Sequence, residues 1–364
     1  MNAPAVSDAS DDGAAPSGHW RPFDDLPQAH GGPVIRARLR VSPQDFVVDE
    51  VLAFGPDGEG EHRLLKVRKT GANTDWTARR IALLAGVPAK AVGYAGLKDR
   101  HAVTTQWFSV HLGKRPEPRW RLLGDDGIEV LESHAHRRKL KRGVLAGNRF
   151  TLRLRDVTGD RDAVPGRLSA IAADGVPNYF GPQRFGRDAG NLIRADALFR
   201  GRAGRVSRHQ RGLWLSAARS QVFNEVLALR VERGDWGLPL QGDRLQLRGS
   251  HSHFLAEVID DPIRERIASG DVLPTGPLVG DGAPLTIGAA ADLEQRVLSP
   301  FAGWIAGLAE AGLRQERRAL RLDPEYLESD WPAADELRLC FTLPAGSYAT
   351  VLLRELVDWD EPER

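Results

Sequence analysis

Apolar and polar residues alternate with a period of two in several separate stretches, a pattern typical of β-strands with one buried face. The clearest of these stretches are 34–40, 46–51, 63–69, 105–112 and 337–343. A Pro-Asp-Gly-Glu-Gly turn at 56–60 lies between the second and third stretches. The pattern therefore predicts that these two strands form a hairpin.

Helical spacing of apolar residues marks four further segments. One helix is expected from Asn73 or Thr74 to about Leu84, with Gly86 just beyond its end. The others are expected at 163–173, at 216–234, and from a cap at Ser347 to about residue 357. Strands and helices are mixed without a regular βαβ rhythm. The fold class predicted from this order is α+β with a mixed, largely antiparallel sheet.

The length of 364 residues suggests two domains. The first 31 residues are rich in Ala, Pro, Gly, Asp and Ser, so a disordered tail is expected at 1–31. The single cysteine, Cys340, excludes an intrachain disulfide and a cysteine-based zinc site. No apolar stretch reaches the roughly 20 residues of a membrane span, and the first residues do not resemble a secretory signal. A cytoplasmic protein without membrane association is expected.

The charge is balanced overall, with Lys+Arg 50 against Asp+Glu 49, but it is unevenly distributed. Residues 134–155 carry eight Lys or Arg and no carboxylate, and residues 183–212 carry eight Arg against two Asp. Within the first block Phe150 begins an alternating strand, so Arg149, Arg153 and Arg155 share its outer face. Such a row of Arg is a plausible track for nucleic-acid phosphates, and a solvated surface is the alternative.

The segment 93–107 places Lys98, Asp99, Arg100 and His101 in a loop flanked by glycine, just before a strand. Neighbouring positive charge favours the ionised form of a carboxyl group. An ionised Asp99 could act as a nucleophile or a base. A surface ion pair or a turn is the alternative interpretation of the same residues.

Two other segments have the composition of a ligand-binding loop. Residues 176–187 interleave three aromatic residues with Asn178, Gln183 and Arg184, and residues 343–350 form a strand–turn–helix that carries Tyr348. Aromatic rings stack on bases, amides read base edges and Arg binds phosphate. A buried aromatic corner and an ordinary helix cap are the alternatives. His251 and His253 lack a third ligand at a recognisable spacing, so no metal site is predicted.

Several of these segments resemble signatures of the tRNA pseudouridine synthase D (TruD) family. The similar segments, in chain order, are 45–50, 58–62, 95–102, 136–143, 177–186 and 343–356. They include Ala-Gly-Leu-Lys-Asp-Arg-His-Ala around Asp99, Pro-Asn-Tyr-Phe-Gly after residue 176 and Leu-Pro-Ala-Gly-Ser-Tyr-Ala-Thr around Tyr348. The resemblance extends from about Val34 to the C-terminus.

The resemblance implies a pseudouridine-synthase fold interrupted by an inserted α/β TRUD domain. The catalytic domain would comprise 32–203 and 322–364, and the insertion 204–321. The implied activity is isomerisation of uridine 13 of tRNA to pseudouridine, with no cofactor and no metal. RNA is expected in the cleft between the two domains. tRNA is the implied partner, no protein partner is indicated, and a monomer is expected.

The family's functional residues map onto specific positions of this chain. Asp99 matches the catalytic aspartate, and Lys98 lies beside it. Residues that match substrate-contacting positions are Phe46, Asn178, Phe180, Gln183, Arg184 and Tyr348. Tyr348 departs from the Phe of many members, which keeps the ring and adds a hydroxyl.

The implied chemistry needs the target base to leave its stack and enter a pocket with aromatic walls. Asp99 would either attack the substrate covalently or remove a sugar proton, and the sequence leaves both open. One alternative function is a non-enzymatic RNA-binding or RNA-folding protein that does not depend on Asp99. Another is a carboxylate hydrolase that acts on a nucleoside or a sugar and releases free uracil.

Overall fold

The computed structural model describes residues 20–141 and 143–362, and these form two compact units. Unit 1 contains the described residues up to Pro27 and the segment Tyr179–Leu320. Unit 2 contains Gln28–Asn178 and the described residues from Arg321 onwards. No helix in the described ranges is long and apolar enough to cross a membrane.

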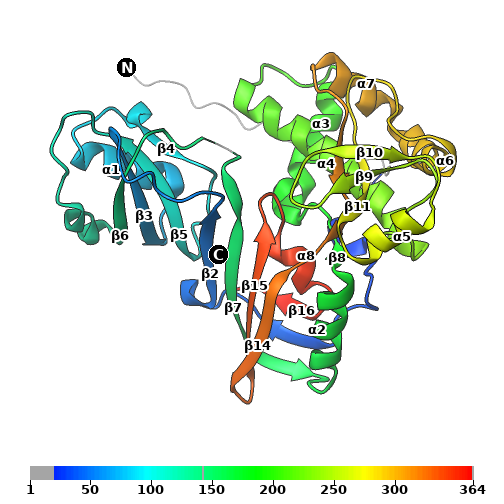
Figure 1. The fold of residues 1–364 in the computed structure, drawn as a ribbon, viewed down its shortest axis with the longest axis horizontal. Helices are drawn as coiled ribbons and strands as arrows, with labels where there is room; N and C mark the ends of the chain where they lie inside the picture. The colour runs from blue at the N-terminus through cyan, green and yellow to red at the C-terminus, as the bar shows by residue number, and fades with distance from the viewer. Residues whose placement is uncertain (1–19, 142, 363–364) are drawn as a thin grey trace, which may run out of the picture. The chain divides into compact units, whose positions relative to one another are not determined.

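A ten-stranded mixed sheet forms the framework of unit 2 (Figure 1). Its main path runs in the order β14 (Glu325–Ala333), β15 (Glu336–Pro344), β7 (Leu145–Gly159), β2 (Phe46–Leu52), β5 (Val103–His111), β3 (His62–Thr70) and β6 (Ile128–His136). The strands attached to this path are β1 (Ile35–Arg38), β4 (Val92–Tyr94) and β16 (Val357–Asp360). A separate short pair joins β8 (Val176–Pro177) and β13 (Arg321–Leu322).

Most neighbouring strands of this sheet are antiparallel, but β2 pairs with β5 and β1 with β16 in parallel. Helix α1 (Thr74–Leu84) packs on the sheet through Ala78, Ile81 and Ala82, which share a core with Phe108 and Val110 of β5. The helices α2 (Ala163–Asp174) and α8 (Ala349–Leu353) complete unit 2. The observed mixture of helices with a mixed sheet confirms the α+β prediction.

Unit 1 is built around α4 (Arg208–Glu232), which is buried along most of its length. The helices α3 (Gly190–Phe199), α6 (Gly288–Leu298) and α7 (Ala302–Glu310) pack against it, while α5 (Asp261–Ala268) packs on strand β11 (Val272–Leu278). A four-stranded sheet follows the order β10 (His253–Ala256), β9 (Asp243–Leu247), β11 and β12 (Glu316–Ala319). All its neighbouring strands pair antiparallel.

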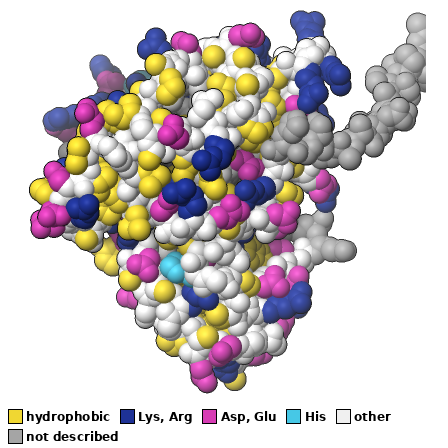
Figure 2. Space-filling view, turned by 90° about the vertical axis from the view of Figure 1, so that its right-hand side faces the viewer, with side chains coloured by type: hydrophobic (Ala, Val, Ile, Leu, Met, Phe, Trp, Pro, Cys, Tyr) yellow, Lys and Arg dark blue, Asp and Glu magenta, His cyan; other side chains and the backbone are white. Residues whose placement is uncertain are grey.

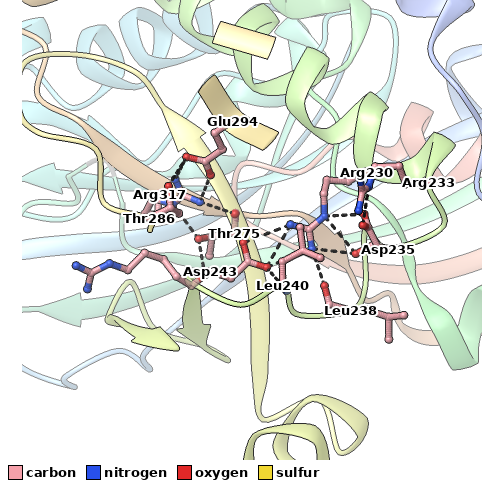
Figure 3. A network of polar contacts seen from close by, with 11 residues as sticks. Arg230, Arg233, Asp235, Leu238, Leu240, Asp243, Thr275, Thr286, Glu294 and Arg317 are labelled. Carbon is pink, nitrogen blue, oxygen red and sulfur yellow. Dashed lines mark hydrogen bonds and ion pairs between the residues drawn. The ribbon is translucent and has the colours of Figure 1, made fainter. Parts of the chain in front are cut away.

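A buried network of charged groups joins α4 to this sheet (Figure 3). Arg230 of α4 forms ion pairs with Asp243 at 3.2 Å and with Asp235 at 2.8 Å. On the other side of Asp243, Arg317 of β12 pairs with Glu294 at 2.6 Å. Buried charges are stable only when they are paired and hydrogen-bonded, so this network locks one arrangement of unit 1.

The hairpin predicted for the second and third strands is wrong. Strand β5 lies between β2 and β3 and pairs with both. Seven of its nine residues are buried, which is typical of a central strand with both faces covered. The turn at 56–60 therefore connects two strands that are separated by a third.

Two predicted helices have different bounds. Helix α4 begins at Arg208 rather than near Ser216, because Ser207 and Gln210 form a capping box. The last helix ends at Leu353 rather than near residue 357. Val357 begins β16, whose backbone pairs with β1 instead of continuing the helix.

The disordered tail expected at 1–31 does not fit residues 20–31, and its first 19 residues lie outside the described part. Within unit 1, the Trp20 ring contacts Trp304 with centroids 5.3 Å apart, and Arg21 pairs with Glu225. Within unit 2, the backbone N–H of His30 donates to Glu355. These contacts fix the segment that the composition alone suggested would be disordered.

The division into two compact units differs from the expected domain boundaries, which stay a prediction. The first junction lies at 178/179 instead of 203/204, because α3 packs on α4 and Phe180 exchanges two hydrogen bonds with Asn224 of α4. The second junction lies at 320/321. The assignment of 204–321 as a TRUD domain stays a prediction.

Candidate active site in unit 2

Asp99 lies in the loop between β4 and β5, beside the N-terminal end of β2. The parallel register pairs Val47 with Val103, so the start of β2 and the start of β5 lie side by side. The loop that precedes β5 is thereby brought next to the segment that precedes β2. This arrangement places Asp99 close to Arg40, although the two are far apart in sequence.

Arg40 pairs with Asp99 through an Nη2–Oδ2 distance of 3.2 Å. The other carboxylate oxygen, Oδ1, accepts a hydrogen bond of 2.9 Å from the backbone N–H of His101. The Arg40 side chain is only 8% exposed, whereas that of Asp99 is 21% exposed. Asp99 is therefore held from within the protein and remains partly accessible to a ligand.

Arg40 is itself fixed by three features. Its guanidinium lies over the Phe46 ring at 3.9 Å from the centroid, and it also pairs with Glu361 at 2.9 Å. Its backbone has φ of 58°, in the left-handed region that non-glycine residues rarely adopt. Such an outlier persists only where the surroundings hold it, and it is frequent at functional sites.

Phe46 is almost completely buried and packs edge-on against Phe150, with centroids 6.2 Å apart. The structure therefore brings Phe46 to the site as the support beneath Arg40. Its contact with a target base stays a prediction.

Lys98 points to a buried carboxylate rather than to Asp99. Its Nζ lies 3.0 Å from Oε1 of Glu50 and donates to Oδ1 of Asn148. The second oxygen of Glu50 accepts 2.9 Å from the backbone N–H of Trp107. Burial raises the pKa of Glu50, while Lys98 and the Trp107 N–H favour its ionised form. Lys98 anchors the loop to β2 and β7.

A second lysine, Lys69 on β3, is fully buried near the same loop. Its Nζ donates to the carbonyl oxygen of Ala72 at 2.7 Å. Burial lowers the pKa of Lys69 to about 8, against the attraction of Asp99 and Glu50. Two ammonium groups and one guanidinium therefore lie around the Asp99 loop, and the carboxylates of Glu50 and Glu361 offset part of their charge.

Two buried polar side chains hold the loop from below. The Thr74 hydroxyl accepts from the backbone N–H of Lys98 at 3.0 Å and donates to Oε1 of Gln106. The Gln106 amide donates at 2.7 Å to the carbonyl oxygen of Gly96. The first residue of α1 and the centre of β5 thus fix the backbone on the N-terminal side of Asp99.

Asn178 and Tyr348 also belong to unit 2. Asn178 is buried and directly follows β8, and Tyr348 is half-buried at the N-cap of α8. Their roles toward a substrate stay predictions.

Phe180, Gln183 and Arg184 belong to unit 1. Phe180 is buried, its ring packs edge-on against Phe223, and the Arg318 guanidinium lies 4.2 Å from its centroid. Arg184 donates to the Ser216 hydroxyl at 2.9 Å, while Gln183 is exposed. Their predicted contacts with a substrate are not tested by this geometry.

The two basic blocks differ in how much of their charge is free. Arg155 pairs with buried Asp45 and with Glu336, and Arg153 pairs with Glu336. Although burial favours the neutral carboxyl, hydrogen bonds from Arg155 and Ser42 keep the pKa of Asp45 below its usual range. This neutralises much of the expected phosphate track. The second block has exposed arginines near the start of α4, namely Arg202, Arg205, Arg208 and Arg211. On the face drawn in Figure 2, basic and acidic side chains are interspersed.

Sequence reasoning missed Arg40, Glu50, Lys69, Thr74 and Gln106. The strand pattern of the sequence could have indicated two of them, Glu50 and Lys69. Phe46, Val48 and Glu50 share one face of β2, and Val67 and Lys69 share one face of β3. A charged residue at an inward position must find a partner, which marks it for inspection. Nothing in the sequence indicated the positive φ of Arg40.

The arrangement suits chemistry that uses one carboxylate. Asp99 is held in orientation by the Arg40 guanidinium and the backbone N–H of His101, and its side chain remains partly exposed. Among the described residues no group of three or more His, Cys, Asp or Glu is placed to hold a metal ion.

Comparison with protein families gives a match over most of the chain. Residues 29–204 and 189–356 match the family model described as tRNA pseudouridine synthase D (TruD).

Similar curated proteins carry the same name. The tRNA pseudouridine synthase D of Methylococcus capsulatus is 51% identical over 338 residues, covering 93% of this chain and 96% of that protein. The tRNA pseudouridine synthase D of Aeromonas salmonicida is 48% identical over 343 residues, covering 94% and 96%. A crystal structure titled as the putative tRNA pseudouridine synthase D of Methanosarcina mazei has a similar fold. It has a TM-score of 0.67 at 20% identity and covers 91% of this chain and 94% of that one.

Proposed function

The chain belongs to the tRNA pseudouridine synthase D family, and from this premise we propose that it isomerises uridine 13 of tRNA to pseudouridine with Asp99 as the catalytic carboxylate. The observation that carries the proposal is the Asp99–Arg40 pair. It joins a partly exposed carboxylate to a buried guanidinium held in a rare backbone conformation. The proposal includes a location in the cytoplasm, where such a protein would meet tRNA.

The reaction detaches uracil from C1′ of the ribose and rejoins it through C5. Asp99 acts on the substrate either as a nucleophile or as the base that removes a sugar proton. Arg40 is a positioning residue, because it orients Oδ2 of Asp99 and supplies positive charge without losing a proton itself. The target uridine is flipped out of its stack to reach the carboxylate.

The remaining groups position the loop and the RNA. Thr74 and Gln106 fix the loop backbone, and Lys98 ties it to Glu50. In this proposal Phe46, Asn178, Phe180 and Tyr348 contact the target nucleotide. Gln183, Arg184 and the exposed arginines near the start of α4 contact the phosphate backbone, which carries most of the affinity for nucleic acids.

The test is an assay of pseudouridine in tRNA incubated with the purified Asp99→Asn variant. Loss of the carboxylate is expected to lower the rate at least ~10³-fold, as for other catalytic groups. tRNA affinity is expected to stay within a few-fold of the wild type. Asp156→Asn is the matched control, because Asp156 is another Asp paired with an Arg, here Arg38, at an exposed site.

The same experiment separates the alternatives. A non-enzymatic RNA-binding protein would leave both variants equal and form no pseudouridine. A hydrolase would release free uracil, which chromatography of the products detects. Mapping the modified position, with a tRNA that carries cytidine at position 13 as the control, tests the site of reaction. Pseudouridine at another position would contradict the assignment to uridine 13.

A further inference from the structure

A pocket of about 590 Å³ lies in unit 2 at the end of β3 and β5 that is opposite to the Asp99 loop. Strand β3 runs from His62, which lines the pocket, to Thr70, which pairs with Val103 just after the Asp99 loop. Nine residues at ~3.3 Å per step give a separation of about 26 Å along the strand. The proposed reaction at Asp99 makes no use of this pocket.

The rim of the pocket is cationic. Lys90, Arg115 and Lys139 are exposed there, and none of them pairs with a carboxylate in the described chain. Of the nearby carboxylates, Glu117 pairs with Arg63, and Glu61 lies 3.2 Å from Nε2 of His111 at the pocket wall. The ammonium of Lys139 donates to the carbonyl oxygen of Lys90 at 2.6 Å, which holds the two lysine segments together.

His62 lines the same pocket beside His111. Its ring is 4.7 Å from that of His111, and its Nδ1 is buried without a hydrogen-bond partner among the described residues. Burial lowers the pKa of His62, the nearby His111, His136 and Lys139 act in the same direction, and Glu61 opposes them. The three exposed cations of the rim, Lys90, Arg115 and Lys139, favour an anionic ligand.

Part of the wall is apolar. Val87, Pro88 and Ala91 follow α1 and face the pocket beside the cations. A ligand that matches both parts has a negatively charged group attached to a less polar body. A nucleotide unit of RNA has this character, because its phosphate is anionic and its base and ribose present weakly polar faces.

We propose that this pocket binds the sugar–phosphate backbone of the same RNA whose uridine lies at Asp99. The inference rests on the proposed function and extends it to a second contact. The proposal also gives a role to Lys139, the member of the 134–155 block that lines the pocket, whereas Arg153 and Arg155 are neutralised by carboxylates.

The experiment measures tRNA affinity over a range of salt concentrations for the double variant Lys90→Gln/Lys139→Gln. The dissociation constant is expected to rise about tenfold, and the slope of log K against log salt to fall by about 1–2, since each lost phosphate contact removes roughly one unit. The rate at saturating tRNA should remain within twofold. The matched control is Lys114→Gln/Arg119→Gln, which removes two exposed cations of the same unit outside the pocket. Equal losses in the two double variants, or no loss in the first, would overturn the proposal.

A second measurement follows the ring resonances of His62 and His111 in the Asp99→Asn protein. Substrate tRNA should shift both at concentrations near its dissociation constant, while inorganic phosphate and uridine monophosphate should do so only at far higher concentrations. Binding of tRNA without such shifts contradicts the proposal, as does a response to phosphate or to the mononucleotide at lower concentration than to tRNA. If the wild type forms pseudouridine but the pocket variant behaves like its control, only this second contact fails. If the wild type forms none, the proposed function itself fails.

Discussion

Each unit contains a cluster of buried charge in which an arginine pairs with an aspartate. The two clusters differ in how far the aspartate is exposed to solvent. In unit 1, Asp243 is 1% exposed and Arg230 3% exposed, and Asp243 also accepts the backbone N–H of Leu240. In unit 2, Arg40 is similarly buried, but the Asp99 that it holds is 21% exposed. The first cluster is closed to solvent and the second has one accessible carboxylate.

The difference shows why buried charge alone does not identify an active site. Burial raises the pKa of Asp243, and Arg230 opposes that effect, so strong electrostatic coupling is present at a site with no access for a substrate. At Asp99 the distinguishing features are access and orientation. A carboxylate that reacts must be held by some neighbours and still reach a ligand.

The largest effect on stability is expected from Asp243→Ala. The substitution removes a carboxylate that pairs with the buried Arg230 guanidinium, and this should lower the free energy of unfolding by ~3–5 kcal/mol. Chemical denaturation measures this loss, and the rate of the folded fraction should be unchanged. Asp271→Asn, which breaks the exposed pair with Arg266, is the control and should cost no more than ~1 kcal/mol. Equal losses in the two variants would remove the distinction between a closed network and a surface pair.

The next effect, on rate rather than stability, is expected from Arg40→Gln. Without the guanidinium Asp99 loses its orientation, and kcat should fall about 100-fold while KM changes little. Arg40→Lys, which keeps a cation over Phe46, should recover much of the rate. A fall in the melting temperature with unchanged kcat would show that Arg40 serves folding only.

A smaller loss of about tenfold in kcat is expected from Thr74→Val. The substitution keeps the shape of the side chain but leaves the Lys98 N–H and the Gln106 amide oxygen without their partner. Thr74→Ser restores the hydroxyl and should restore the rate. The diagnostic measurement is the separate effect of each substitution on kcat and on KM. A purely structural role of Thr74 would lower the free energy of unfolding and leave kcat unchanged in both variants.

The most gradual effect is a pH dependence of stability from Lys69, which develops over several pH units. Its pKa is about 8 in the folded protein and 10.5 as a free side chain. Between these values the unfolded chain binds more protons, so the free energy of unfolding should rise with pH by at most ~1.4 kcal/mol per unit. Lys69→Met should abolish this rise, whereas Lys66→Met, on the same strand with an exposed ion pair, should keep it. Identical pH profiles for the wild type and Lys69→Met would contradict the assignment.

The sequence predicted local structure best where a short-range signal was strong. Helix α1 lies where the Asn73 cap and Gly86 placed it, and β15 follows the alternation around residues 337–343. The predictions were wrong where segments far apart in the sequence compete to pair with the same strand. Strand β5 displaced the expected hairpin partner of β2, and β16 took residues from the last helix by pairing with β1.

The sequence by itself determined the family, the α+β class and the candidate Asp99, because these depend on residue types at fixed local spacing. Only the tertiary structure brought Arg40 to Asp99 and placed Lys69, Glu50 and Gln106 around the loop. It also showed that Arg155 is occupied by Asp45 while Lys139 lines a cationic pocket. The physical reason is that ion pairing, burial and access depend on which strands become neighbours, and this is decided by pairing across the whole sheet.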